Sequence, residues 1–308
     1  MITIYHSTAR APKLETLPVA KAGSWIHVVE PSSGELDKLA RDFNLERDIL
    51  HDATDIYEAP RAEMENDATY VFARYCHPAG KDIATEPLLI VYTKDNIITI
   101  MRKSDAVLDQ MLNGTIEVIS TQKTKTFLRI LEQINRSFRQ QLTIESKRIL
   151  QIRSRLRQSE ISNFEFVSFI ELEEDFNEFL TSLQPQAAVL ASLRTGRYMR
   201  LYEEDQDLIE DLTLGTTELI EITKSRLRTL VNIRQAYDTI ATNNLNRTFR
   251  RLTSIGIFLT IPMIAGGLWG MNVLLPFSEN PNAFWFIVVG VSAVTISFYL
   301  YFKRKNWV

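Results

Sequence analysis

Small and neutral polar side chains recur along an uncharged segment near the C-terminus of this 308-residue chain. They follow alternating steps of three and four residues: Gly256, Thr260, Met263, Gly267 and Gly270. This spacing puts them on one face of a helix, and small residues there let helices approach closely. The stripe therefore predicts a helix that packs against copies of itself around a common axis.

The stripe continues toward the N-terminus with a step near the 3.5-residue repeat of supercoiled helices. Its further members are Thr253, Phe249, Asn246, Thr242, Thr239, Gln235 and Asn232. This seam is too polar for a dry bundle core and favours a water-filled one. Arg228 also falls on the extrapolated seam, where a positive charge would hinder cations, so a slip of register at that point stays an open alternative.

Two uncharged segments position this stripe, residues 252–272 and 283–302, and each is long enough to cross roughly 30 Å of hydrocarbon as a helix. Arginines precede the first span and Lys303-Arg304-Lys305 follows the second, whereas the loop 273–282 has Glu279 as its one charge. Because positive residues stay on the cytoplasmic side, both termini are predicted inside and the loop outside. Neither span contains an acidic residue, which disfavours a proton-coupled carrier.

Glycine and proline become rare after about residue 120, which predicts a helical region over 121–203 and a stalk helix over 204–251 that continues into the first span. Such a helix would be on the order of 100 Å long. Breaks are expected around 158–163 and 195–197. The second helix of this region carries a run of acidic residues, which we interpret as a solvated face or as a surface that concentrates cations: Glu165, Glu171, Glu173, Glu174, Asp175 and Glu178.

Residues 1–120 mix β-rich runs with helical spacing and predict an α/β domain. Asp95-Asn96 separates two apolar runs and indicates a hairpin, while Leu36, Leu39, Leu45 and Leu50 indicate one helix over 33–53, capped by Ser32 or Ser33. The only cysteine, Cys76, excludes an intramolecular disulfide and is interpreted as an ordinary strand residue.

The composition also excludes several classes of function. A net charge of −3 argues against nucleic acid as a partner. We find no phosphate-binding loop and no nucleophile paired with a base, so we predict neither an enzyme nor an organic cofactor. The N-terminus lacks a secretory signal, and the N-terminal part is expected in the cytoplasm.

Gly270-Met271-Asn272, placed at the end of a long helix and about ten residues before a final span, resembles the CorA family of magnesium transporters. The resemblance extends to residues 246–251, to Pro262, to the basic tail 303–308 and, in the N-terminal domain, to residues 58–63 and 70–72. It implies an α+β membrane protein: a cytoplasmic α/β domain, a long stalk helix that continues into the first of two transmembrane helices, and a homopentameric funnel in the cell's inner (plasma) membrane.

The resemblance also implies roles for individual residues. Gly270, Met271 and Asn272 would form a mouth that selects hydrated Mg²⁺, with Glu279 in the adjoining loop. The pore and its gates would be lined by Asn246, Leu252, Thr253, Gly256, Thr260, Met263 and Gly267. Asp211, with Asp82 as a possible partner, would bind regulatory Mg²⁺ between subunits. Pro262 lies one residue later than in the family pattern, and Thr260 replaces a bulky apolar gate residue. The resemblance therefore does not decide which residue forms the narrowest ring of the pore.

Two other functions remain open at this point. A zinc transporter of the same superfamily with proton coupling is one, although such relatives often change the middle residue of the tripeptide and this chain retains Met271. A non-conducting oligomeric membrane scaffold is the other, and it predicts tolerance of Asn272→Ala. Besides Mg²⁺, the pathway could pass Co²⁺ or Ni²⁺, and membrane lipid is the remaining expected partner.

Overall fold

The structure is a computed structural model that describes residues 1–79, 82–157, 163–271 and 280–305. The side chains of residues 79, 82, 155–157 and 163–166 are not among those described. The chain divides into two compact units, Met1–Val231 and Asn232–Val308. Their boundary falls within one long helix, so this helix contributes residues to both units.

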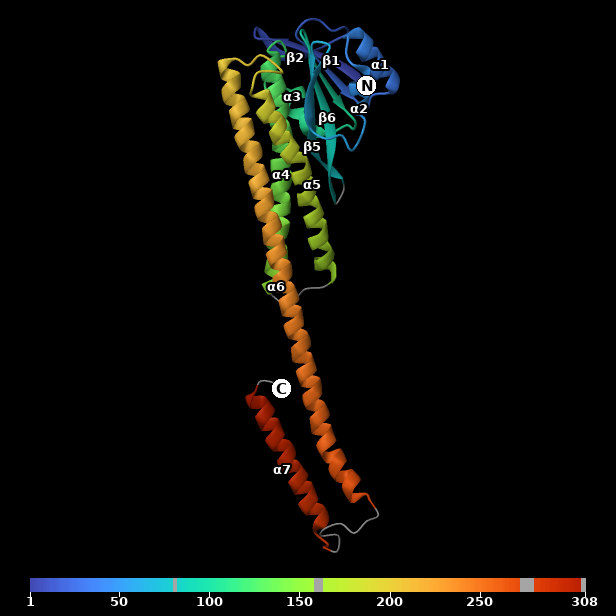
Figure 1. Ribbon diagram of the computed structural model, residues 1–308, viewed down its shortest axis with the longest axis vertical. Helices are drawn as coiled ribbons and strands as arrows, with labels where there is room; N and C mark the ends of the chain where they lie inside the picture. Colours follow the sequence, from blue (N-terminus) through green and yellow to red (C-terminus); the bar gives the residue numbers. More distant parts are fainter. Residues whose placement is uncertain (80–81, 158–162, 272–279, 306–308) are drawn as a thin grey trace. The chain divides into compact units, whose positions relative to one another are not determined.

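Seven strands form one mixed sheet in the first unit (Figure 1). They are β1 (Ile2–Thr8), β2 (Ala11–Leu17), β3 (Ser24–Val29), β4 (Arg61–Glu65), β5 (Ala68–Ala79), β6 (Asp82–Tyr92) and β7 (Ile97–Met101). The order is β2-β1-β3-β7-β6-β5-β4, and neighbours are antiparallel except β3 and β7. The predicted hairpin is confirmed, since Tyr92 pairs with Ile97 and leaves residues 93–96 as the loop.

One face of the sheet is covered by two short helices, α1 (Ser33–Asp42) and α2 (Arg47–Asp52) (Figure 1). Side chains alternate between the two faces of a strand, so Ile26 and Val28 of β3 enter the core beneath these helices together with Leu36 and Leu50. Burying each such side chain contributes about 1.5–3 kcal/mol. This core fixes α1 and α2 on the sheet.

The helix predicted over residues 33–53 is in fact two helices. Its N-terminus is confirmed: Ser32 accepts from the Glu35 backbone N–H, and the Glu35 side chain accepts from the Ser32 backbone N–H. The break follows Phe43, where Asn44 adopts the left-handed conformation with φ +52°. Asparagine tolerates this conformation better than most residues, and one such residue ends a helix.

The opposite face of the sheet packs against two long helices, α4 (Lys123–Arg157) and α5 (Asn163–Leu193). A 3₁₀ turn, η1 (Ala106–Leu108), and a short helix, α3 (Asp109–Leu112), precede them. Phe179 joins the helices, with its ring centroid 5.7 Å from that of Phe138 and 6.0 Å from that of Phe176. The expected break after α5 is confirmed, and Gly196 turns the chain there with φ +74°.

A single helix of 67 residues, α6 (Glu203–Trp269), follows and belongs to both units. Pro262 lies inside it and has no N–H to donate to the carbonyl of Phe258. The last helix, α7 (Ala283–Arg304), belongs to the second unit. Among the described residues, α6 and α7 are the helices long and apolar enough to span a membrane, and only 6% and 0% of the residues are buried in the most apolar 18-residue stretch of each.

Candidate functional site

The predicted pore residues all lie on the part of α6 that belongs to the second unit, and all are exposed in the single chain. They are Asn246, Leu252, Thr253, Gly256, Thr260, Met263 and Gly267. A side-chain atom added at Gly256 or Gly267 would meet nothing within 4 Å. No other part of the chain that the structure describes therefore covers this stripe.

The contact between α6 and α7 uses a different face of α6. The Phe258 ring lies 6.2 Å from the Tyr299 ring and 5.8 Å from the Phe302 ring, measured between centroids. Ser254, one turn before Phe258, is fully buried. At about 100° per residue, Ser254 and Phe258 lie roughly half a turn around the helix from Gly256, Thr260 and Met263. The stripe thus faces away from α7 and stays available for another molecule.

The hydroxyl groups on α6 are held by the helix backbone. Thr260 Oγ1 donates to the Gly256 carbonyl oxygen at 2.8 Å, and Ser254 Oγ donates to the Arg250 carbonyl oxygen at 2.8 Å. Each hydroxyl proton is therefore used within the helix, and the lone pairs of the hydroxyl oxygen remain free to accept. On the exposed stripe, Thr260 presents an acceptor oxygen, which suits water or a hydrated cation.

The end of α6 is built for a tight turn of backbone. Gly270 N–H donates to the Gly266 carbonyl at 3.0 Å, and a Cβ at Gly270 would lie 3.1 Å from that same oxygen. Glycine avoids this crowding. The last carbonyl groups of a helix lack partners within the helix, and its C-terminus is the negative end of the helix dipole. Gly270 and the exposed Met271 therefore lie where a cation is favoured, while Asn272 and Glu279 fall outside the described residues.

The predicted regulatory carboxylates are not brought together within one chain. Asp211 is exposed on α6 and lines a groove of about 560 Å³ that also includes Arg129, Arg136 and Arg139 of α4. Asp82 begins β6, but its side chain is outside those described. Across the described ranges, no three His, Cys, Asp or Glu side chains are grouped closely enough to hold a metal ion. A regulatory site at Asp211 would therefore need groups from another subunit.

The acidic run of α5 is not simply solvated, so that interpretation is corrected. Asp175 is buried, and both it and Glu171 lie near Arg148 of α4, with nitrogen–oxygen distances of 3.9 and 3.3 Å. Glu178 accepts a 2.5 Å hydrogen bond from the Thr85 hydroxyl and lies 3.9 Å from Arg74. These carboxylates hold α5 against α4 and the sheet, while Glu174 is exposed.

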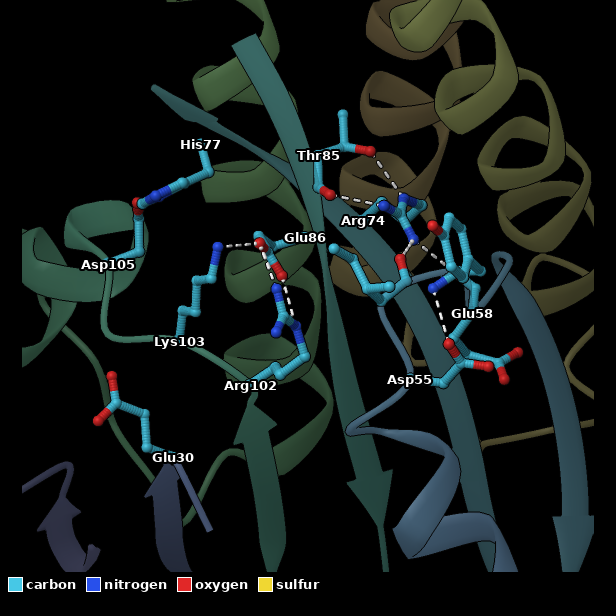
Figure 2. Close-up of polar contacts among 12 residues, drawn as sticks. Glu30, Asp55, Glu58, Arg74, His77, Thr85, Glu86, Arg102, Lys103 and Asp105 are labelled. Carbon is cyan, nitrogen blue, oxygen red and sulfur yellow. Dashed lines mark hydrogen bonds and ion pairs between the residues drawn. The ribbon is translucent and has the colours of Figure 1, made fainter. Parts of the chain in front are cut away.

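A buried ion cluster on β6 and the segment after β7 was missed from the sequence (Figure 2). Glu86 is 1% exposed and accepts two hydrogen bonds from Arg102, at 2.7 and 2.8 Å, and contacts Lys103 at 2.8 Å. Burial opposes ionisation of Glu86, but the hydrogen bonds from Lys103 and Arg102 outweigh it and lower the pKa of the carboxyl. A glutamate directly before Pro87 and the apolar run 88–91 was the one available signal.

Arg74 of β5 is a second polar centre in the same view (Figure 2). Its guanidinium donates to the backbone carbonyls of Ile56 and Glu58 at 2.8 Å each and to the Thr85 hydroxyl at 2.7 Å. It thereby ties the segment between α2 and β4 to strands β5 and β6. Both Arg74 and Glu86 have their partners within the first unit, which marks them as structural groups.

A folded α+β unit and two helices with long apolar segments, one of them with an exposed polar stripe, are the arrangement of an integral membrane protein. Residues 20–304 match the family described as CorA-like Mg²⁺ transporter protein. The chain belongs to this family, and its two C-terminal helices are the membrane-spanning helices of a membrane transporter. Family membership also confirms that the chain is a transporter and not an enzyme.

Individual proteins show the same likeness over nearly the whole chain. The cobalt/magnesium transport protein CorA of Methanocaldococcus jannaschii is 23% identical over 297 residues, which cover 92% of this chain and 91% of the relative. The complete structure of the CorA magnesium transporter from that organism matches with a TM-score of 0.88 at 20% identity, over 100% of this chain and 99% of the other. The structure of the full-length CmaX protein matches with a TM-score of 0.76 at 14% identity, over 99% and 97%. The structural matches confirm the predicted N-terminal α/β domain, long stalk helix and C-terminal helix.

Proposed function

We propose that this chain assembles with copies of itself, as a homopentamer, into a channel that admits hydrated Mg²⁺, and that Co²⁺ and Ni²⁺ also pass. Family membership supports transport of a divalent cation. The observation that carries the assembly is the stripe of α6, which is exposed in one chain and faces away from α7. Copies packed through this stripe enclose an axis lined by small residues and hydroxyl oxygens.

In this proposal residues 204–251 form the stalk, 252–272 the pore-lining span, 273–282 the outer loop, 283–302 the second span and 303–308 a basic tail. Both termini lie in the cytoplasm, because basic residues flank both spans on that side. Glu279 then adds a negative charge outside the mouth, where it attracts cations.

The mouth selects a hydrated ion through neutral oxygens. Mg²⁺ gives up its waters reluctantly, so a conducting site cannot be a tight carboxylate cage. Gly270 carbonyls and Asn272 amides, repeated around the axis, accept hydrogen bonds from the ion's waters and release the ion again. Met271 packs behind this ring and orients it. Thr260 and Met263 narrow the passage within the membrane, and Leu252 and Asn246 narrow it toward the cytoplasm.

Transport needs no other energy source than the membrane potential. A divalent ion that crosses an inside-negative potential of about 100 mV gains roughly 4 to 5 kcal/mol, twice the value for a single charge. Bound Mg²⁺ at Asp211 and Asp82 of neighbouring subunits closes the ring of cytoplasmic units when internal Mg²⁺ is high. Carboxylates brought together in this way repel until a divalent ion neutralises them.

Mg²⁺ influx into proteoliposomes tests the proposal. The purified chain is reconstituted, an inside-negative potential is imposed, and an internal Mg²⁺-sensitive dye reports influx for wild type and Asn272→Ala. We expect potential-dependent influx that falls at least tenfold in the variant. Asn282→Ala is the matched control, since Asn282 precedes α7 and its side chain makes no capping hydrogen bond. Absence of wild-type flux for Mg²⁺, Co²⁺ and Zn²⁺ alike would reject transport and favour a scaffold.

A further inference from the structure

Six positively charged side chains flank the two apolar segments, three shortly before residue 252 and three directly after residue 302. They are Arg247, Arg250 and Arg251 of α6, and Lys303, Arg304 and Lys305 at the end of α7. All six are exposed, and within the described ranges none of them forms an ion pair with a carboxylate. We call these six residues the basic junction.

Two arginines of the basic junction, Arg247 and Arg251, lie on the α7 side of α6. Arg247, Arg251, Ser254 and Phe258 follow steps of four, three and four, so they share one face of the helix. Phe258 on this face contacts Tyr299 and Phe302 of α7. The polar stripe with Gly256 and Thr260 lies on the other side. Arg247 and Arg251 are therefore turned away from the proposed ion pathway, whereas Arg250, one helical turn after Asn246, lies between the two faces.

The end of α7 brings the other three charges to the same place. Phe302 is 6% exposed, and its ring lies against that of Phe258. The residues after Phe302 run toward the arginines, because Tyr299 and Phe302 of α7 both contact Phe258 and the two helices are antiparallel. At 1.5 Å per residue, Arg304 and Arg251 are separated by roughly 5 to 8 Å along the helix axes, which their long side chains can span.

This position lies at the boundary between water and hydrocarbon. The uncharged part of α6 begins at Leu252, directly after the arginines, and exposed apolar side chains such as Ile255 and Leu259 follow. On α7, Tyr299 and Tyr301 are exposed next to the basic residues, as expected of aromatic side chains at an interface. These six cations, which have no carboxylate partner among the described residues, repel one another at such a boundary until an anion joins them.

We propose that the basic junction binds the phosphate group of an anionic phospholipid, with the acyl chains lying against the exposed apolar side chains of α6 and α7. Guanidinium groups hold a phosphate through paired, charge-assisted hydrogen bonds, and basic pockets between membrane helices bind anionic headgroups. Leu259 and Tyr301, 66% and 57% exposed, provide apolar surface for the chains beside this charge. This inference concerns the lipid-facing side of the helices and does not depend on ion conduction.

Lipid retention by the full-length chain tests this site. The protein is purified in an uncharged detergent and mixed with phosphatidylglycerol or phosphatidylcholine, and the retained lipid is counted by native mass spectrometry. We expect phosphatidylglycerol to be retained at least tenfold more strongly. The preference should disappear in Arg250→Gln/Arg251→Gln/Arg304→Gln, because each cation near an anionic surface contributes about fivefold.

The matched control is Arg10→Gln/Lys13→Gln/Lys38→Gln, three exposed cations of the first unit, which should keep the preference. Lys303→Gln/Lys305→Gln repeats the test on α7 alone and should lower the preference severalfold even if the triple variant fails to fold. Displacement of phosphatidylglycerol by an equal concentration of inorganic phosphate or glycerol phosphate would identify a site for free phosphate and overturn the proposal. Equal retention of both lipids by wild type would also overturn it.

Discussion

The two compact units differ in what covers their apolar and charged side chains. In the first, large side chains such as Trp25 and Phe179 are fully buried, and the carboxylate of Glu86 is enclosed by cations of the same chain. In the second, Met263 and Trp285 remain 72% and 65% exposed. Apolar surface on this scale is not left in water. The first unit therefore completes its own fold, whereas the second leaves apolar surface to be covered by lipid and, in the proposed assembly, by further copies of the chain.

The largest effect on Mg²⁺ influx is expected from Gly256→Leu, a substitution that should leave the fold of a single chain unchanged. Gly256→Leu adds a side chain where nothing lies within 4 Å, so a fold of the single chain has no reason to change. If copies pack through this face, the bulky residue separates them or fills the passage. We expect Mg²⁺ influx in proteoliposomes to fall more than tenfold, with a change of assembly size by light scattering.

Gly290→Leu is the control for that experiment, because Gly290 of α7 is exposed and also has open space around it. Its influx should stay within about twofold of wild type. Equal losses of Mg²⁺ influx in the two variants would mean that the stripe of α6 is no more an assembly surface than α7 is. The stripe would then no longer support the contrast between the two units.

A smaller but clear effect is expected for the buried carboxylate of the first unit. Glu86→Gln leaves Arg102 and Lys103 without their counter-charge, and we expect a loss of about 2 kcal/mol, because both cations remain partly exposed. A fragment of residues 1–231 is suited to the measurement by urea unfolding, since Trp25 is its only tryptophan and is buried. Glu15→Gln on the exposed strand β2 should change stability by less than about 0.5 kcal/mol.

The pH dependence of this loss gives a second test. The pKa of Glu86 is lower in the folded state than its ordinary value of 4.5, so the folded state favours the ionised carboxyl. Its contribution is complete above the unfolded pKa and disappears as the pH falls through the folded pKa. The difference between wild type and Glu86→Gln should be constant near pH 7 and shrink below about pH 4.5. A difference that grows on acidification contradicts this assignment.

The smallest effect on stability is expected at Glu145 of α4. Its pH dependence should have the opposite sign to that of Glu86. Burial raises its pKa, the ion pair with Arg148 partly offsets this, and nearby Glu171 adds to the increase. A raised carboxyl pKa means that stability falls as the pH rises from the unfolded toward the folded pKa. Glu145→Gln should therefore change the stability of the same fragment by less than about 1 kcal/mol at pH 7, and wild type should gain on the variant as the pH falls. A loss larger than that of Glu86→Gln would contradict this.

Local patterns in the sequence were enough to predict much of the fold. Ser32 and Glu35 mark a helix start because the capping hydrogen bonds form within four residues. The stalk part of α6, residues 203–251, follows from the near absence of glycine and proline, with Gly215 as the one exception, and the two spans follow from their lack of charge. The division of residues 33–53 into two helices was missed, since Asn44 is compatible with a helix interior unless the surrounding packing requires a turn.

Contacts between distant residues could not be read in this way. Glu86 and Arg102 are sixteen residues apart, and their ion pair appears only once β6 and β7 are aligned. The acidic residues of α5 look solvated until Arg148 and Arg74 are placed beside them. For the candidate site, periodicity identified the stripe of α6, whereas the roles of Asn272, Asp211 and Asp82 rest on family resemblance, because their partners would belong to other subunits.

The single cysteine has a practical consequence for mapping the stripe. Cys76 is 3% exposed, and burial raises the pKa of its thiol, so thiol reagents have little access to it and little thiolate to attack at neutral pH. The natural chain is therefore expected to react very little with maleimide reagents. A cysteine introduced at Thr253 or Met263 would report, by its own labelling rate in intact vesicles, which positions of α6 meet water.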